Sequence, residues 1–168
     1  RRDPVEPAEP LSTLPAQVLA LPGLMRVPAY VLDHAWTARA WNAPAAALFV
    51  GWLDTPQTEK NLLRYVFLEP RAQTLIADWT ERSRRLVAEF RSDFSRRPRD
   101  AGMGAVVDDL LARSPAFVAL WRQQTVLARE GGERAFHVPR RGLARFEQST
   151  LIVAAHPDVK LVCLAPLA

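Results

Sequence analysis

Residues 72–94 read AQTLIADWTERSRRLVAEFRSDF, and this stretch decides the fold because it is the clearest helical segment in the chain. Its large apolar residues recur at four- and seven-residue spacings, which is the pattern of an amphipathic helix with one buried stripe. The members of the stripe are Leu75, Trp79, Leu86, Phe90 and Phe94. Two pairs four residues apart, Asp78 with Arg82 and Glu81 with Arg85, support the helix because the acid comes first. We therefore expect one long helix in the middle of the chain.

The part of the chain before this helix predicts two strands and several short helices. We expect strands over residues 28–32 and 36–41 and helices over residues 11–21, 45–50 and 61–68. Asn42 has the character of an N-cap, with Pro44 in the first helical turn after it. Thr55-Pro56 is a similar start signal, and Pro22-Gly23 is a helix stop. The spacing of the two strands suits an antiparallel pair with a short connection.

The part after the long helix predicts two more helices and then strands. The helices are expected over residues 103–113 and 115–121, and strand-like runs cover 126–129, 134–138, 143–153 and 159–164. Glycines and the His156-Pro157-Asp158 turn separate these runs, from which we expect about three strands. The order is two strands, a helical block and about three strands. This order predicts an α+β fold with an antiparallel sheet of about five strands and a helical insertion between strands 2 and 3.

Composition is that of an ordinary globular domain. The chain has 168 residues, of which 49% are apolar and 24% charged, and this size favours one domain plus an arm at residues 1–10. No apolar run approaches the ~18 residues of a membrane span, and the charged, proline-rich start does not resemble a signal peptide. We therefore expect a cytoplasmic protein with no membrane partner.

The charge balance is basic but does not by itself indicate nucleic-acid binding. The net charge is +4, yet only two of the 22 basic residues are lysines, which is typical of a GC-rich genome. The arginines between Arg82 and Arg99 are partly balanced by acids on the same segment, which favours a solvated helix face. No helix-turn-helix pattern is present in the sequence.

The residues that enzymes use are not spaced for catalysis. There is no G-x-S-x-G motif, and His34, His137 and His156 are scattered without metal-ligand spacing. Asp108 and Asp109 are adjacent on a helix and so face different directions. We expect no catalytic residue, no metal site and no cofactor. The lone cysteine, Cys163, excludes an internal disulfide and lies in an apolar run, where a packing role is the simpler interpretation.

One arrangement on the long helix has a binding interpretation. Arg84 and Arg91 are seven residues apart and share a face with small neighbours beside the aromatic stripe. An arginine at the edge of an apolar groove can hold a carboxylate while a hydrocarbon tail enters the core. The simpler alternative is a pair of surface arginines with buried stems. The aromatic residues have two readings as well, a filled core or a core that encloses a cavity.

Many short motifs, in order over residues 25–166, resemble the ligand-binding domain of MmyB-like transcription regulators. They include PAYVLD at 28–33, AWN at 40–42, NLLR at 61–64, EPR at 69–71, Asp78-Trp79, Arg84 to Ala88, Arg91 and Leu120-Trp121. The resemblance implies a PAS-like fold in which a sheet and helices enclose a pocket for a small apolar ligand such as a fatty acid. The sequence departs from the family at Gln124, where a histidine is common, and at Cys163 or Leu164, where a tyrosine is usual.

The resemblance also implies an organisation and a set of contacts. Residues 1–24 would be a linker and short helix after a helix-turn-helix domain that is absent here, and residues 25–168 the PAS-like ligand-binding domain. The expected ligand contacts are Trp41, Arg64, Phe67, Trp79, Arg84, Phe90, Arg91 and Trp121. The implied partners are an apolar or amphipathic small molecule, a second copy in a homodimer, and DNA only through the helix-turn-helix domain. The alternative function is a dimerisation or protein–protein interaction module without a ligand, and an enzyme ranks third.

Overall fold

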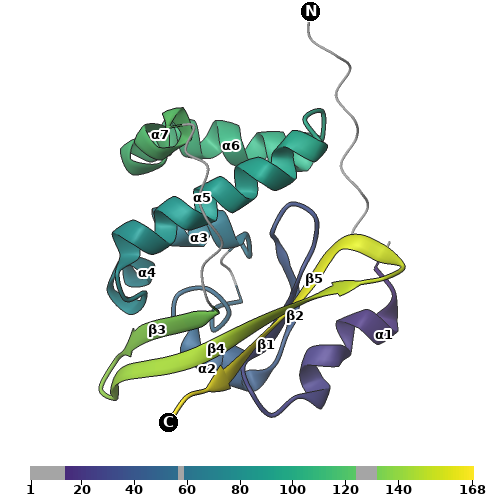
Figure 1. Cartoon of the computed structure of the whole chain (residues 1–168), viewed down its shortest axis with the longest axis vertical. Coiled ribbons are helices and arrows are strands. Elements are labelled where there is room, and N and C mark those ends of the chain that lie inside the picture. Colours follow the sequence, from purple (N-terminus) through teal and green to yellow (C-terminus); the bar gives the residue numbers. More distant parts are fainter. Residues whose placement is uncertain (1–13, 57–58, 124–131) are drawn as a thin grey trace, which may run out of the picture.

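The computed structural model describes residues 14–56, 59–123 and 132–168, and these form an α+β fold built on one antiparallel sheet (Figure 1). The sheet has five strands in the order β2-β1-β5-β4-β3. The strands are β1 (Ala29–Leu32), β2 (Ala38–Trp41), β3 (Glu133–Val138), β4 (Gly142–Val153) and β5 (His156–Pro166). Because helices α2 to α7 all lie between β2 and β3 in the sequence, the predicted α+β class and helical insertion are confirmed.

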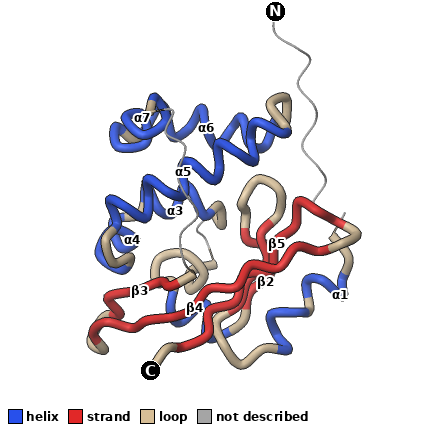
Figure 2. Tube along the Cα trace, in the orientation of Figure 1, coloured by secondary structure: helices blue, strands red, loops and turns tan. Residues whose placement is uncertain are grey.

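The helices are α1 (Ala16–Leu19), α2 (Ala43–Leu48), α3 (Leu62–Leu68), α4 (Pro70–Leu75), α5 (Trp79–Arg96), α6 (Ala101–Arg113) and α7 (Pro115–Arg122), with a 3-10 turn η2 (Leu21–Leu24). Helices α3 to α7 lie over one face of the sheet, and α1 lies on the other side of it (Figure 2). None of the helices in the described residues is long and apolar enough to cross a membrane.

The predicted continuous helix over 72–94 is wrong, because the chain breaks between α4 and α5. Ile76 pairs with Phe136 of β3 in a short antiparallel bridge, and the Ala77 amide donates to the Ala135 carbonyl at 3.1 Å. Asp78 then takes a left-handed conformation with φ of 49°. Residues 76–78 are therefore used to tie the helical layer to an edge strand, which local helical periodicity does not reveal.

Smaller boundaries also differ from expectation. Helix α1 covers only part of the predicted 11–21 segment, and η2 runs through Pro22-Gly23 instead of ending before it. The last turn falls at residues 154–155, so His156 begins β5. Helix α3 is capped by Asn61, not by Thr55-Pro56. The predicted strand at 126–129 lies outside the described residues.

Asn42 was correctly predicted as an N-cap, and its buried side chain also holds three segments together. Its Oδ1 accepts from the amides of Ala45 and Ala29, while its Nδ2 donates to the Val27 carbonyl at 2.7 Å. This network fixes the start of α2 against β1, whose residues contribute to the cavity described below.

Strand alternation divides the core into two parts. Tyr30, Val162 and Phe146 face the helices and belong to the main core. Val31 and Leu161 are on the other face, where they pack against α1. The inner face of the sheet is therefore the side on which α5 and the other large helices pack.

Candidate functional site

A cavity of about 290 Å³ lies between the inner face of the sheet and helix α5. On the sheet side, Tyr30 of β1, Val162 of β5 and Thr150 of β4 lie next to one another across three paired strands. Glu133 of β3 and Thr150 are exposed members of the lining, so the cavity has a mouth on this side. Its volume is close to the lower limit of ordinary ligand sites.

Helix α5 lines the opposite side with one face. Arg82, Leu86 and Glu89 follow at intervals of four and three residues and therefore share a face of the helix. This face places a cation and an anion at its two ends with an apolar residue between them. The separation of seven residues corresponds to about 10 Å along the helix axis.

Aromatic side chains form much of the apolar lining. They are Tyr30, Trp36, Phe49, Tyr65 and Phe136. Phe49 packs edge-on against Tyr30 at 5.4 Å and against Phe136 at 5.6 Å between ring centroids. These rings hold one another in place because edge-to-face pairs at this separation are favourable. The cavity therefore has a rigid, largely aromatic apolar side.

Two tyrosines of the lining differ in how their hydroxyl groups are used. Tyr65 donates a hydrogen bond to the Val50 carbonyl at 2.7 Å. Tyr30 is 4% exposed as a residue, but its hydroxyl is open to the cavity instead of being bonded to a described residue. Burial raises the pKa of Tyr30 far above its ordinary value, while the charge of Arg134 lowers the pKa and that of Glu89 raises it. Charges of both signs thus act on a neutral, buried hydroxyl.

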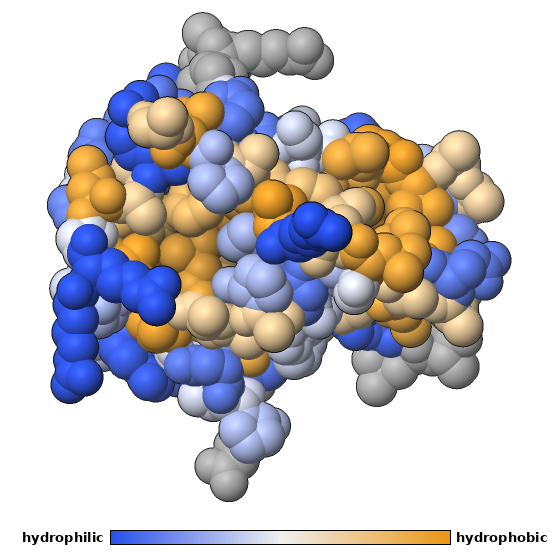
Figure 3. Space-filling view, turned by 90° about the horizontal axis from the view of Figure 1, so that it is seen from below, coloured by the Kyte–Doolittle hydropathy of each residue, from blue (hydrophilic) through white to orange (hydrophobic). Residues whose placement is uncertain are grey.

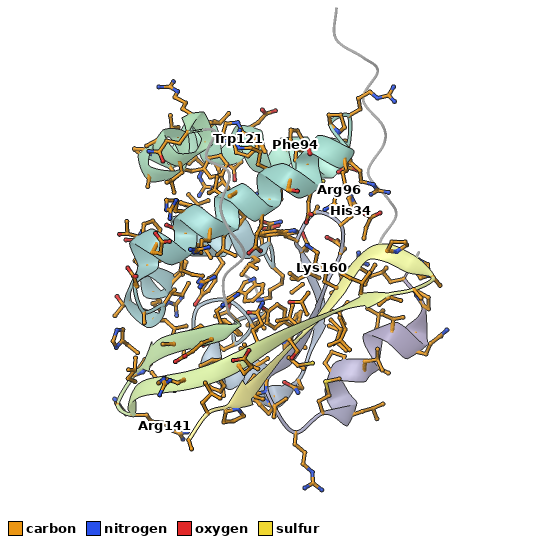
Figure 4. All side chains as sticks on the ribbon, viewed as in Figure 1. His34, Phe94, Arg96, Trp121, Arg141 and Lys160 are labelled. Carbon is orange, nitrogen blue, oxygen red and sulfur yellow. The ribbon has the colours of Figure 1, made fainter. Side chains whose placement is uncertain are left out.

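An ion pair closes one end of the cavity. Lys160 of β5 points up from the sheet towards α5 (Figure 4) and meets the Asp93 carboxylate at 2.7 Å. The Trp36 indole also donates to Asp93, at 2.9 Å. Burial tends to raise the pKa of Asp93, but the hydrogen bonds from Lys160 and Trp36 outweigh it and lower the pKa below its ordinary value. Asp93 therefore links α5 to both β5 and the β1–β2 connection.

Of the four aromatic contacts predicted on the helices, Phe67 and Phe90 are buried in the core and Trp79 and Trp121 pack against it, and none of them lines the cavity. Phe67 contacts Trp79 at 5.5 Å, and the Trp79 indole donates to the Val66 carbonyl at 3.0 Å. Phe90 is fully buried and contacts Trp36 at 5.2 Å. Trp121 lies beside Phe94 above α5 (Figure 4), on the side of α5 away from the sheet.

The three arginines that were predicted to contact a ligand bind neighbouring groups of the protein. Arg84 binds Glu81 through two hydrogen bonds of 2.7 and 3.0 Å.

Arg91 lies over the Trp121 ring at 4.3 Å and donates to the Trp121 carbonyl. Arg64 binds Asp109 at 2.9 Å. Trp41, the remaining predicted contact, lies 5.7 Å from the Lys60 ammonium. None of the eight predicted residues is among those that line the cavity, so their role as ligand contacts stays a prediction.

The sequence analysis did not predict as ligand contacts the charged and amide or hydroxyl residues that line the cavity: Asp78, Arg82, Glu89, Glu133, Arg134, Gln148, Thr150 and Lys160. Gln148, Thr150 and Lys160 are polar residues at strand positions that face the helices. Polar side chains at alternate strand positions could have indicated them, but the sequence does not say which face of a strand is buried.

Two other hollows are less suited to a small molecule. One, of about 390 Å³, lies by Asp33, His34 and the β4–β5 turn, and the other, of about 380 Å³, includes Arg64. Both are larger than the cavity under α5, but charged residues that pair with one another dominate them, as in Arg39–Asp33 and Arg64–Asp109. Ligand sites are mostly apolar with few polar groups, so the cavity under α5 is the better candidate.

The cavity and its surroundings contain few reactive or metal-binding groups in the described part of the chain. No group of three or more metal-ligating side chains occurs within residues 14–56, 59–123 and 132–168. Cys163 lies on the other face of the sheet with its sulfur 3.3 Å from that of Met25, and burial raises the pKa of its thiol. A neutral thiol is a poor nucleophile. Apolar walls with several polar groups at the edges suit an amphipathic molecule.

Comparison with protein families gives a match over nearly the whole chain. A family model described as the MmyB-like transcription regulator ligand binding domain matches residues 15–168. The search of curated proteins found no match.

Proposed function

We propose, since this chain belongs to the MmyB-like transcription regulator ligand binding domain family, that it is the sensor of a regulator and binds a small amphipathic molecule between α5 and the sheet. The observation that supports this most is the cavity of about 290 Å³ with an aromatic lining and charged residues at its edges. A filled interaction module would leave no such space, because protein interiors pack to the density of organic crystals.

The fatty-acid ligand and the PAS-like description are parts of this proposal. The strand order β2-β1-β5-β4-β3, with the large helices over one face, supports a fold in which the sheet and helices enclose a pocket. Arg82 and Arg134 bring guanidinium groups to the lining of the cavity, and a guanidinium can bind an acid group. A carboxylate with an apolar body is therefore the ligand class that the lining favours.

Ligand binding can act on the rest of a regulator only by favouring one conformation over another. The Lys160–Asp93–Trp36 contacts join the sheet to α5 at one end of the cavity. An occupant that separates or tightens these two layers would shift the position of α5 and of the helices packed on it. Operator affinity would change by the difference in ligand affinity for the two conformations.

Mass spectrometry of the purified chain tests the proposal. Denaturation and organic extraction are expected to release a small molecule from the wild type and from Ser149→Trp, but not from Thr150→Trp. Thr150 lines the cavity, whereas its exposed neighbour Ser149 points to the other face of the same strand. Extraction of the same molecule from all three proteins, or from none, would contradict binding at this site.

The homodimer is a second proposal, supported by apolar residues on the surface. Leu24 is 80% exposed, and Leu151 and Ile152 at the end of β4 are 50% and 54% exposed. Figure 3 shows hydrophobic patches on the face of the molecule seen from below. Analytical ultracentrifugation is expected to give a dimer that Leu151→Glu converts to a monomer. A wild-type chain that stays monomeric at high concentration would contradict this assembly.

A further inference from the structure

Lys160 of β5 is a charged residue of the cavity lining whose hydrogen-bond donors are not all used by the protein. Its ammonium group has three N–H donors, and one of them binds the Asp93 carboxylate at 2.7 Å. Asp93 is its hydrogen-bond partner among the described residues, which leaves two donors for other acceptors. The side chain is 23% exposed, so water reaches the ammonium group only in part. Lys160 therefore has donors to offer to a ligand.

The ammonium group of Lys160 is held in position by the protein itself. It lies 5.2 Å from the centre of the Trp36 ring, which lines the same cavity. Asp93 does not depend on Lys160 alone. The Trp36 indole donates to Asp93 at 2.9 Å, and the Arg96 guanidinium donates to it at 2.7 Å. A ligand that shares the ammonium group thus leaves the carboxylate with partners, and it meets a donor that is already in place.

Lys160 and Arg82 lie at opposite ends of the cavity. Arg82 and Asp93 are eleven residues apart on α5, a spacing that returns them to the same face of the helix. This spacing corresponds to about 16 Å along the helix axis. The Ala77 amide ties the segment before α5 to β3, whereas Asp93 ties the other end of α5 to Lys160 of β5. The cavity therefore has a cation at each end.

An acyl chain between these two cations has a defined length. Consecutive Cα atoms, three bonds apart, are separated by about 3.8 Å, so about 16 Å corresponds to about 13 bonds of an extended chain. That is a chain of about 12 carbon atoms with an oxygen at each end. The cavity of about 290 Å³ is about twice the size of one that binds benzene, which is room for one such chain. A terminal methyl group would cover the Lys160 ammonium without giving it a hydrogen bond, at a cost in free energy.

We infer that the preferred ligand is a long-chain acid with an oxygen acceptor at its far end, such as an ω-hydroxy acid, and that Lys160 binds this acceptor. The inference rests on the proposed function and adds to it. Arg82 brings a guanidinium to the end that holds the acid group, and Lys160 recognises the other end of the chain. Fatty acids without the second oxygen are ligands of the same cavity with lower affinity.

Isothermal titration of the chain, freed of ligand by unfolding and refolding, tests the inference with dodecanoate and 12-hydroxydodecanoate. The two acids carry the same charge and differ by one hydroxyl group. The wild type is expected to bind the hydroxy acid at least about tenfold more tightly, because hydrogen bonds to charged groups are among the stronger ones. Lys160→Met removes the ammonium group and keeps a long side chain. It should bind both acids about as tightly as the wild type binds dodecanoate.

Asp93→Asn is the matched control, because it breaks the same ion pair but leaves the ammonium group in the protein. It should keep a preference of about tenfold for the hydroxy acid. Loss of this preference in Asp93→Asn, or an equal loss of both acids in Lys160→Met, would show that the ion pair acts through the structure and would overturn the inference.

Two results for the wild type separate the inference from the proposed function. Equal affinities for the two acids, with neither bound by Thr150→Trp, would overturn the inference and leave the proposed function intact. Binding of neither acid would also overturn the inference, whereas the extraction experiment decides the proposed function on its own.

Discussion

Replacing each cavity tyrosine by phenylalanine should affect the stability of the ligand-free protein in opposite directions. Tyr30 and Tyr65 are equally buried, at 4% and 3% exposed, and each substitution removes one oxygen atom. They differ in that the Tyr65 hydroxyl donates to the Val50 carbonyl at 2.7 Å, whereas the Tyr30 hydroxyl has no partner in the described residues. The pair therefore compares a hydroxyl that is bonded to the protein with a hydroxyl that is open to the cavity.

The magnitudes follow from the hydrogen bonds. Tyr65→Phe loses a short bond and leaves a carbonyl without its donor, which should lower the free energy of unfolding by about 1–2 kcal/mol. Tyr30→Phe loses no bond and removes a polar group from an apolar environment. Its effect should lie between zero and a gain of about 1 kcal/mol, because water in the cavity can solvate the wild-type hydroxyl in part. The two variants should differ by about 2 kcal/mol.

Urea denaturation followed by tryptophan fluorescence measures this difference, with the chain first freed of ligand by unfolding and refolding. Both variants should keep the wild-type slope, so that the midpoint reports stability. If ligand-free Tyr30→Phe is destabilised as much as Tyr65→Phe, the Tyr30 hydroxyl has a partner within the protein instead of being open to the cavity.

Three further outcomes are expected. Arg82→Gln should weaken binding of an acidic ligand about tenfold by titration calorimetry, whereas Arg84→Gln, on the other side of α5, should change it less than about twofold. Asp93→Asn should lower stability at pH 7, and this deficit should shrink as the pH falls below about 4. The reason is that the depressed pKa of Asp93 stabilises the folded state only while the carboxylate is charged, as pH-dependent denaturation would show. Asn42→Ala should lower the free energy of unfolding, measured by urea denaturation, by about 3 kcal/mol, because it leaves several buried backbone groups without partners.

Each of these has a result that contradicts it. If Arg82→Gln and Arg84→Gln lose the same affinity for an acidic ligand, the contacts predicted from the sequence would be favoured over the cavity as the binding site. A deficit in Asp93→Asn that keeps its full size as the pH falls below about 4 would show that its charge is not what stabilises α5 against β5. If Asn42→Ala lowers the free energy of unfolding by less than about 1 kcal/mol, water replaces the hydrogen bonds of the Asn42 side chain.

The parts of the fold that the sequence predicted are those controlled by local interactions. Asn42 was recognised as a cap because capping depends on residues three positions away, and the strands were recognised from their branched residues and turns. The break at Ile76 was missed because its cause is a pairing with Phe136, sixty residues further on. No local pattern reports such a contact.

The site was harder to predict than the fold, and α5 shows why. The aromatic stripe was taken as the ligand side of the helix, but Trp79 and Phe90 pack against other rings of the core. The cavity lies on the face with Arg82, which is about 200° around the helix from Arg84. Choosing between the two faces needs the position of the sheet, which the helix sequence does not contain.

A crystal structure of the wild-type chain bound to the molecule it retains on purification tests the central claim most directly. The account predicts density for a small amphipathic molecule between α5 and the inner face of the sheet, in contact with residues that line the cavity. Only ordered water in that cavity, with the ligand bound instead beside Arg84 and Arg91, would contradict it.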